Sequence, residues 1–218
     1  MITERAAEFY AKSASNHDRV YDKPERQEDL EELHEQVENV LAGHRVLELA
    51  CGTGYWTRVI AEVAEQVVAI DINPEMIALA RLRQLPEDVV TLRVADAFDL
   101  PDDLGEGQFT AVFIGFWWSH VRRAEQDRFL TQLRRKVGKD VLLFMVDDDF
   151  VEDSSESVAR TDADGNTYQI RVAPDGERYE IPKNYPSDSA LRKRLAGAAR
   201  EIRIERSEFY WMLTCRLK

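Results

Sequence analysis

Apolar segments that alternate with amphipathic helical patterns predict an α/β fold with a doubly wound, mostly parallel sheet. Two features support this fold class: a glycine turn joins the first apolar segment to a helix, and an acidic residue, Asp71, ends the second apolar segment. The chain has 218 residues, which suits a single domain with a substantial core. We therefore expect one domain whose ligand site lies at the carboxyl edge of the sheet.

The N-terminal residues predict a helical cap that precedes the core. Ile2, Ala6 and Tyr10 lie on one side of a short amphipathic helix candidate, and a polar segment follows it. Residues 25–41 carry leucine and valine on one stripe, which is the pattern of a helix that packs on a sheet. We expect residues 1–24 to form the cap and the helix after it to be structural.

The chain is organised around VLELACGTGYWT, residues 46–57. This stretch predicts a buried strand, a turn at Gly52 and Gly54, and the first turn of a helix. Glycines permit the tight turn and let a ligand approach the backbone N–H groups at the start of the helix. Asp71 follows about 20 residues after the turn, where doubly wound nucleotide-binding folds hold ribose hydroxyls.

The rest of the chain continues this alternation and then departs from it. The expected elements are a helix from Asn73 to about Leu85, strands over 89–94, 109–116 and 141–147, and a helix over 126–137. Residues 148–165 are acidic and loop-like, and TYQIRV and ERYEI predict a β-hairpin across a Pro-Asp-Gly turn. A helix capped by Ser187 or Asp188 and two closing strands complete the chain.

The motifs ELACGTG, VVAID and VADAF, in this order, closely resemble the class I S-adenosylmethionine-dependent methyltransferases, over about residues 28–147. The resemblance implies a seven-stranded sheet with an antiparallel C-terminal strand, S-adenosylmethionine as cofactor and S-adenosylhomocysteine as product. It implies that Glu48 orients the methionyl end, Asp71 binds the ribose hydroxyls, and Asp96 with Ala97 contacts the adenine. The full set of cofactor-binding residues that it implies is Tyr21, Glu48, Ala50, Gly52, Thr53, Gly54, Asp71, Ile72, Met76, Asp96, Ala97, Phe98, Gly115 and Phe116.

The expected division of the chain follows the same plan. It comprises an N-terminal cap (1–24), a cofactor-binding core (25–147), a lid hairpin insertion (148–186), and a C-terminal helix with strands (187–218). Insertions at the carboxyl edge of such sheets commonly line ligand crevices, so the hairpin is interpreted as a substrate lid. A decorative or oligomer-forming hairpin is the alternative.

The acceptor side of the site is less constrained by sequence. His120 is a candidate general base for a phenol, a carboxylic acid or an amine, although it could also line the pocket without transferring a proton. If Arg171 or Lys183 faces the cavity, an acidic substrate group is favoured; exposed cations are the alternative. The candidate substrate contacts are Trp117, Trp118, Arg171, Tyr179, Lys183 and Tyr185.

Charge and composition limit the kinds of partner that we expect the protein to bind. The net charge of −12 is poorly suited to nucleic acid, and no apolar segment long enough for an export signal or a membrane span is visible. Cys51 and Cys215 follow no metal-ligand spacing, and the acidic residues 147–149 are interpreted as a solvated loop, so we expect no metal site. We expect a cytoplasmic monomer or homodimer.

Together these patterns predict S-adenosylmethionine-dependent methyl transfer to an oxygen or nitrogen of a small-molecule acceptor. An RNA or protein methyltransferase stays open as an alternative, and so does a module that binds the cofactor without catalytic activity. A dinucleotide-dependent dehydrogenase is disfavoured because Thr57 occupies the position of the third glycine.

Overall fold

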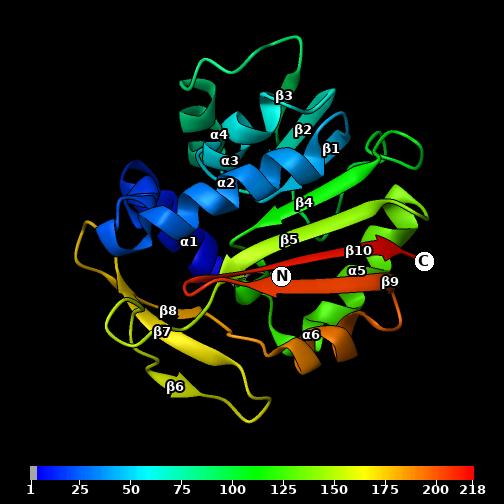
Figure 1. The fold of residues 1–218 in the computed structure, drawn as a ribbon. Coiled ribbons are helices and arrows are strands. Elements are labelled where there is room, and N and C mark those ends of the chain that lie inside the picture. The colour runs from blue at the N-terminus through cyan, green and yellow to red at the C-terminus, as the bar shows by residue number, and fades with distance from the viewer. Residues whose placement is uncertain (1–3) are drawn as a thin grey trace.

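The computed structural model describes residues 4–218, which form one large and one small β-sheet with surrounding helices (Figure 1). The strands of the large sheet are β1 (Arg45–Leu49), β2 (Gln66–Asp71), β3 (Val90–Val94), β4 (Ala111–Gly115), β5 (Leu142–Asp148), β9 (Ala199–Arg206) and β10 (Tyr210–Leu217). Their order is β3-β2-β1-β4-β5-β10-β9; the first five are parallel, and β10 is antiparallel to both of its neighbours. The predicted seven-stranded, mostly parallel sheet is confirmed.

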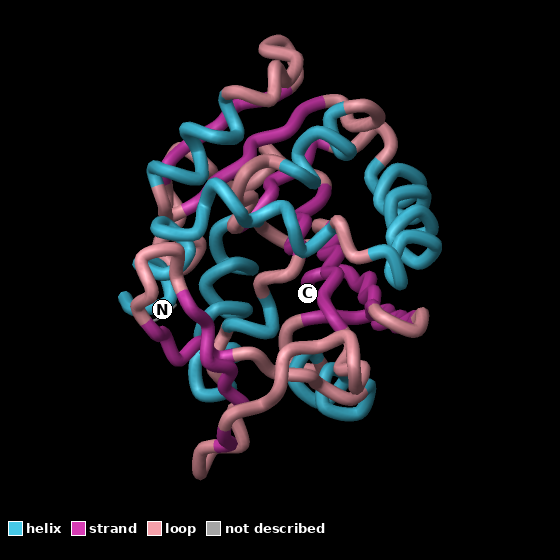
Figure 2. Tube along the Cα trace, turned by 90° about the vertical axis from the view of Figure 1, so that its left-hand side faces the viewer, coloured by secondary structure: helices cyan, strands magenta, loops and turns pink. Residues whose placement is uncertain are grey.

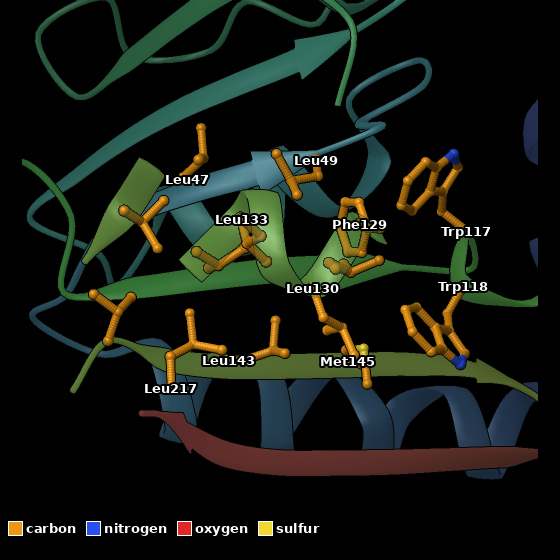
Figure 3. Packing of buried hydrophobic residues seen from close by; sticks show 14 of the residues in the cluster. Leu47, Leu49, Trp117, Trp118, Phe129, Leu130, Leu133, Leu143, Met145 and Leu217 are labelled. Carbon is orange, nitrogen blue, oxygen red and sulfur yellow. The ribbon is translucent and has the colours of Figure 1, made fainter. Parts of the chain in front are cut away.

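Helices cover both faces of the large sheet. They are α1 (Glu4–Ser13), α2 (Gln27–Leu41), α3 (Tyr55–Ala61), α4 (Pro74–Arg81), α5 (Arg123–Val137) and α6 (Asp188–Leu195), with 3₁₀ segments η1 (Ala14–Tyr21), η2 (Pro24–Arg26) and η3 (Trp118–His120). On one face Leu47 and Leu49 of β1 belong to the same core as Phe129 and Leu133 of α5 (Figure 3). On the other face Val46 packs with α2 and α3. Successive strand residues point to opposite faces, so a continuous apolar run fills both cores.

The end of α4 shows how local backbone chemistry sets a helix boundary. The helix ends at Arg81, before the expected end near Leu85. Gln84 has a φ of +54°, in the left-handed region that ends helices. Leu85 precedes Pro86, and a residue before proline is disfavoured in the α region.

The predicted hairpin between β5 and the last helix is confirmed and gains a third short strand. The small sheet consists of β6 (Arg160–Thr161), β7 (Thr167–Val172) and β8 (Arg178–Pro182), in the order β6-β7-β8. Strand β6 lies inside the segment that was expected to be loop-like. Ala6 of α1 packs with Tyr179 and Ile181 of β8, and Figures 1 and 2 both show the small sheet beside α1. Ile2, expected on the apolar side of this helix, lies outside the described residues.

The last helix begins as predicted, and the structure identifies which of its two candidate residues is the N-cap. Ser187 is the N-cap, because its Oγ accepts a hydrogen bond from the Ala190 N–H at 3.3 Å, while Asp188 is the first helical residue. Leu191 and Leu195 are buried against the sheet, as their spacing predicts. Within residues 4–218 no helix combines the length and apolarity that crossing a membrane requires.

Candidate active site

A cavity of about 770 Å³ lies where the carboxyl ends of the parallel strands meet the N-terminal segment and the small sheet. Its walls come from α1 and η1, from the loops that follow β1 to β5, and from β7. Strands β1 and β4 are neighbours in the sheet, so the chain reverses its winding direction between them. Doubly wound sheets bind ligands at this point, and a cavity of this volume suits a small organic molecule.

The glycine turn after β1 is held by Asp71 at the end of β2. One carboxylate oxygen of Asp71 accepts the Gly52 N–H at 2.9 Å, and the other accepts the Asn73 N–H at 2.8 Å. Gly54 has a φ of +78°, and a Cβ there would lie 3.0 Å from the Ala80 Cβ, so glycine is required. Burial raises the pKa of Asp71, and these backbone N–H groups oppose that rise. Asp71 therefore faces the cavity from a fixed position.

Glu48 is a buried acid next to this turn. Its side chain lines the cavity but is only 2% exposed, and the Thr57 hydroxyl donates to it at 2.7 Å. Burial raises the pKa of Glu48 to about 8, and the nearby Asp71 adds to the rise. Within residues 4–218 no cation pairs with this carboxyl group, which makes it a good fit for an ammonium group of a ligand.

The N-terminal segment covers the turn. Tyr21 stacks on Tyr55 with ring centroids 3.8 Å apart, and its hydroxyl accepts the indole N–H of Trp56 at 3.0 Å. Asp18 accepts hydrogen bonds from the Thr53 hydroxyl, on the turn itself, and from Arg83 after α4. These contacts hold η1 over the cavity.

His120 also lines the cavity, and its tautomer is fixed by its neighbours. Its Nδ1 lies 2.6 Å from the Pro182 carbonyl oxygen, which can only accept, so Nδ1 carries the proton. The Nε2 atom is then an acceptor, and the Tyr10 hydroxyl donates to it at 2.9 Å. Burial, followed by the positive charge of Lys183, lowers the pKa of His120 to about 3. An imidazole with this pKa is neutral near pH 7 and a weak base.

The acidic residues that end strand β5 form a buried ion cluster, so the prediction of a solvated loop is wrong for Asp147 and Asp148. Asp147 is fully buried and accepts hydrogen bonds from the Ser119 N–H at 2.8 Å and from Lys183 Nζ at 2.9 Å. Asp148 bridges Lys183 at 2.6 Å and Arg26 at 2.9 Å. Burial opposes the charge of Lys183, but the two carboxylates outweigh it and raise the lysine pKa. The small sheet is thereby tied to the end of β5.

Most of the residues singled out from sequence line this one cavity. They are Tyr21, Glu48, Ala50, Gly52, Asp71, Ile72, Met76, Asp96, Ala97, Phe98, Gly115, Phe116, Trp117, His120, Arg171, Lys183 and Tyr185. Thr53 and Gly54 shape the turn without lining the cavity. Trp118 packs near Phe129 in the core, with ring centroids 6.1 Å apart (Figure 3), and Tyr179 packs on the N-terminal helix.

Several lining residues had not been predicted as site residues. Tyr10 and His17 belong to an N-terminal segment whose aromatic residues were visible in sequence, but nothing in that segment showed which of them face the cavity. Nothing in the sequence around Arg26 and Gln169 indicated that these residues would line the cavity. Their positions depend on contacts with residues far away in the chain, such as Asp148.

Residues 46–140 match the family described as a methyltransferase domain. The demethylmenaquinone methyltransferase of Clavibacter sepedonicus is 41% identical over 81 residues, which cover 37% of this chain and 32% of that protein. The ubiquinone biosynthesis O-methyltransferase of Xanthomonas oryzae pv. oryzae is 42% identical over 82 residues, which cover 37% of this chain and 34% of that protein. The matched region thus spans about a third of the length of these curated relatives.

Solved structures match over the whole chain. A DhpI–SAH complex superposes with a TM-score of 0.78 at 29% identity and covers 98% of this chain and 96% of that one. A DhpI–SAM–HEP complex gives a TM-score of 0.77 at 29% identity, with coverage of 99% and 97%. The 1,6-didemethyltoxoflavin-N1-methyltransferase of Burkholderia thailandensis shares the fold at 16% identity, with a TM-score of 0.57 and coverage of 97% and 89%. The fold, the glycine turn with its two acids and these similarities agree: residues 46–140 form a methyltransferase domain, and the chain has the fold of the class I S-adenosylmethionine-dependent methyltransferases.

Proposed function

We propose that the protein transfers the methyl group of S-adenosylmethionine to an oxygen or nitrogen of a small-molecule acceptor. A single cavity carries this proposal, because it is lined both by Glu48 and Asp71 at the glycine turn and by Tyr10 and His120. We assign the acceptor to the region of Tyr10 and His120, which we call the acceptor end. When bound, S-adenosylmethionine would supply a methyl group on a sulfonium: the S–CH₃ bond would break as the O–CH₃ or N–CH₃ bond forms, S-adenosylhomocysteine would be left, and the proton displaced from the acceptor would pass to water.

The proposed roles at the cofactor end follow from the contacts of each acid. Asp71 already accepts two backbone N–H groups, and its remaining lone pairs are available to ribose hydroxyls. Glu48, with its pKa of about 8, becomes a carboxylate when a ligand ammonium approaches it. Asp96 and Ala97 line the same cavity next to Phe98, and we assign them the adenine.

At the acceptor end the protein's contribution is alignment and exclusion of water. The η1 segment and β7 cover the cavity on the side away from the sheet. The aromatic faces of Tyr21 and Phe116 line it, and such faces attract a sulfonium charge. We propose that His120 orients Tyr10 and does not itself accept the proton, since its pKa is about 3.

The domain organisation, the location and the oligomeric state of the protein are also part of the proposal. We infer one catalytic domain with its core over residues 25–147 and a substrate lid over residues 148–186, working in the cytoplasm as a monomer or homodimer without nucleic acid. The net charge of −12 supports a small acceptor over RNA. The names of relatives that methylate small molecules, among them a ubiquinone biosynthesis O-methyltransferase and a toxoflavin N-methyltransferase, support it too.

A turnover assay tests this function. The protein is incubated with S-adenosylmethionine and, in separate reactions, with small hydroxyl, carboxyl and amine compounds, with RNA and with protein, and S-adenosylhomocysteine is measured. Turnover with a small compound, abolished by Asp71→Ala, is the expected result. Asp88→Ala, which removes an exposed acid outside the cavity, serves as the matched control. Turnover only with RNA or protein contradicts the proposal, and cofactor binding without any turnover favours a binding module.

A further inference from the structure

One wall of the cavity carries an arginine whose charge is largely uncompensated. Arg171 of β7 lines the cavity with its side chain 33% exposed. Its Nη2 donates to the neutral Gln169 Oε1 at 2.8 Å. Within residues 4–218, its ion pair is with Glu156, at 3.9 Å, and the Glu156 side chain is 61% exposed. An exposed pair at this distance is weak, so most of the guanidinium's hydrogen-bonding capacity is free for a ligand.

Two other cations that line the cavity, Lys183 and Arg26, are already neutralised. Lys183 contacts Asp147 at 2.9 Å and Asp148 at 2.6 Å. Arg26 contacts Asp148 at 2.9 Å, and its side chain is only 7% exposed. Their donors are occupied by the ion cluster that joins the small sheet to β5. Of these three cations, Arg171 is therefore the one available to a ligand; Arg19 and Lys23, which also line the cavity, belong to the N-terminal segment.

A fixed network holds the guanidinium in place. Gln169 is 1% exposed, and its Nε2 donates to the Glu156 carbonyl at 2.7 Å and to the Tyr185 hydroxyl at 2.9 Å. Because both amide hydrogens are used there, the Gln169 Oε1 faces Arg171 as an acceptor. A guanidinium held by a buried amide loses little side-chain freedom when it binds a ligand.

Arg171 acts on the acceptor end of the cavity. Burial raises the pKa of the Tyr10 phenol, and the charges of Lys183 and Arg171 oppose that rise. The same two charges help burial to lower the pKa of His120. The guanidinium is thus close enough to Tyr10 and His120 for its field to reach the place assigned to the acceptor.

We propose that Arg171 forms an oxyanion subsite, so that the methyl acceptor carries a carboxylate or phosphate-type group bound by this guanidinium. The planar fork of arginine matches the paired oxygens of such groups, and charge-assisted bonds of this kind orient a ligand strongly. This assignment rests on the proposed function, since it names the acceptor class of the same cavity. It also gives a reason why a chain with a net charge of −12 keeps an uncompensated cation inside its cavity.

Calorimetric titration with inorganic phosphate and with acetate tests the subsite. Each titration is run at constant ionic strength, with and without saturating S-adenosylhomocysteine, on the wild type, Arg171→Gln and Arg178→Gln. Arg178 is an exposed arginine on the neighbouring strand, outside the cavity, which makes it a matched control. We expect saturable binding of at least one anion, weakened about tenfold to a hundredfold in Arg171→Gln and unchanged in Arg178→Gln. The stronger of the two anions distinguishes a phosphate-type from a carboxylate acceptor.

Two results overturn the subsite. One is no saturable binding of either anion to the folded wild type. The other is a loss of S-adenosylhomocysteine affinity in Arg171→Gln with anion binding retained, which would assign the arginine to the cofactor carboxylate. Failure of the wild type to bind S-adenosylhomocysteine contradicts the proposed function instead, while the cofactor-free titration still reports on the anion. If Arg171→Gln does not fold, ¹⁵N NMR of the wild-type Gln169 amide and Arg171 guanidinium must show shifts on phosphate addition.

Discussion

Replacing Glu48 by Gln is expected to stabilise the ligand-free protein at alkaline pH while it weakens cofactor binding. The Glu48 side chain is 2% exposed, and the Thr57 hydroxyl donates a hydrogen bond to it at 2.7 Å. Glutamine keeps that bond through its carbonyl oxygen and cannot ionise. The substitution therefore removes the cost of a buried charge and leaves the local packing nearly unchanged.

The magnitude follows from the pKa of the folded state. Burial raises the pKa of Glu48 from 4.5 to about 8, so the unfolded chain releases this proton over a range where the folded chain retains it. The stability contributed by the protonated form is complete below pH 4.5 and is lost as the pH rises to about 8. At about 1.4 kcal/mol for each pKa unit, the loss is on the order of 5 kcal/mol.

Urea unfolding at about pH 5 and about pH 9 measures this difference, because the midpoint and slope give the free energy of unfolding at each pH. Glu48→Gln should gain several kcal/mol over the wild type at the higher pH and little at the lower. Glu62→Gln, at an exposed position just after α3, controls for the loss of one surface carboxylate. An equal dependence of stability on pH in the wild type and in Glu48→Gln would refute the reasoning.

The remaining predictions concern His120 and the buried ion cluster that contains Asp147. His120 should stay neutral and protonated at Nδ1 from about pH 8 down to about pH 4 in ¹⁵N NMR, because its pKa lies near 3; a titration near pH 6.5 contradicts this. Because the pKa of His120 is lowered in the folded state, neutral His120 contributes its full stability above pH 6.5 and loses it as the pH falls to about 3. The His120→Asn variant should lack this loss of stability in acid unfolding curves. Asp147→Ala should destabilise the protein by about 3–5 kcal/mol, because it leaves the charge of Lys183 buried with one carboxylate fewer. As a comparison, Arg93→Ala breaks an exposed ion pair and should lower the free energy of unfolding by about 0.2–1 kcal/mol. Urea unfolding measures both variants, and similar costs for Asp147→Ala and Arg93→Ala would contradict the assignment of Asp147 to a buried cluster.

The cofactor half of the cavity could be predicted from sequence because its signals are local. The strand, the glycine turn and the helix that follows it lie within one short stretch, and Asp71 ends the next strand along the chain. In a parallel sheet both strand ends meet at the same edge, so the spacing in sequence fixes the spacing in space. Glu48, Gly52 and Asp71 accordingly line one cavity.

The acceptor half depends on contacts between distant segments, which local patterns do not encode. Tyr10 reaches His120 only because α1 packs against the small sheet, and Arg26 reaches Asp148 from before α2. Asp147 was expected in solvent because its neighbours are acidic, yet Lys183, the residue after β8, compensates its charge in the interior. Hydrophobic periodicity identifies elements and their buried faces, whereas the pairing of buried charges becomes visible only when the elements are assembled.

The central claim is that this cavity binds the cofactor through the glycine turn and its acids. Calorimetric titration with S-adenosylhomocysteine, on the wild type, Asp71→Ala and the control Asp88→Ala, tests it most directly. The account predicts saturable binding by the wild type and by Asp88→Ala. In Asp71→Ala the binding free energy should weaken by about 1–3 kcal/mol, because a buried charged hydrogen-bond partner is removed. A folded wild type that binds no S-adenosylhomocysteine, or an Asp71→Ala variant that binds it as tightly as the wild type, would contradict the account.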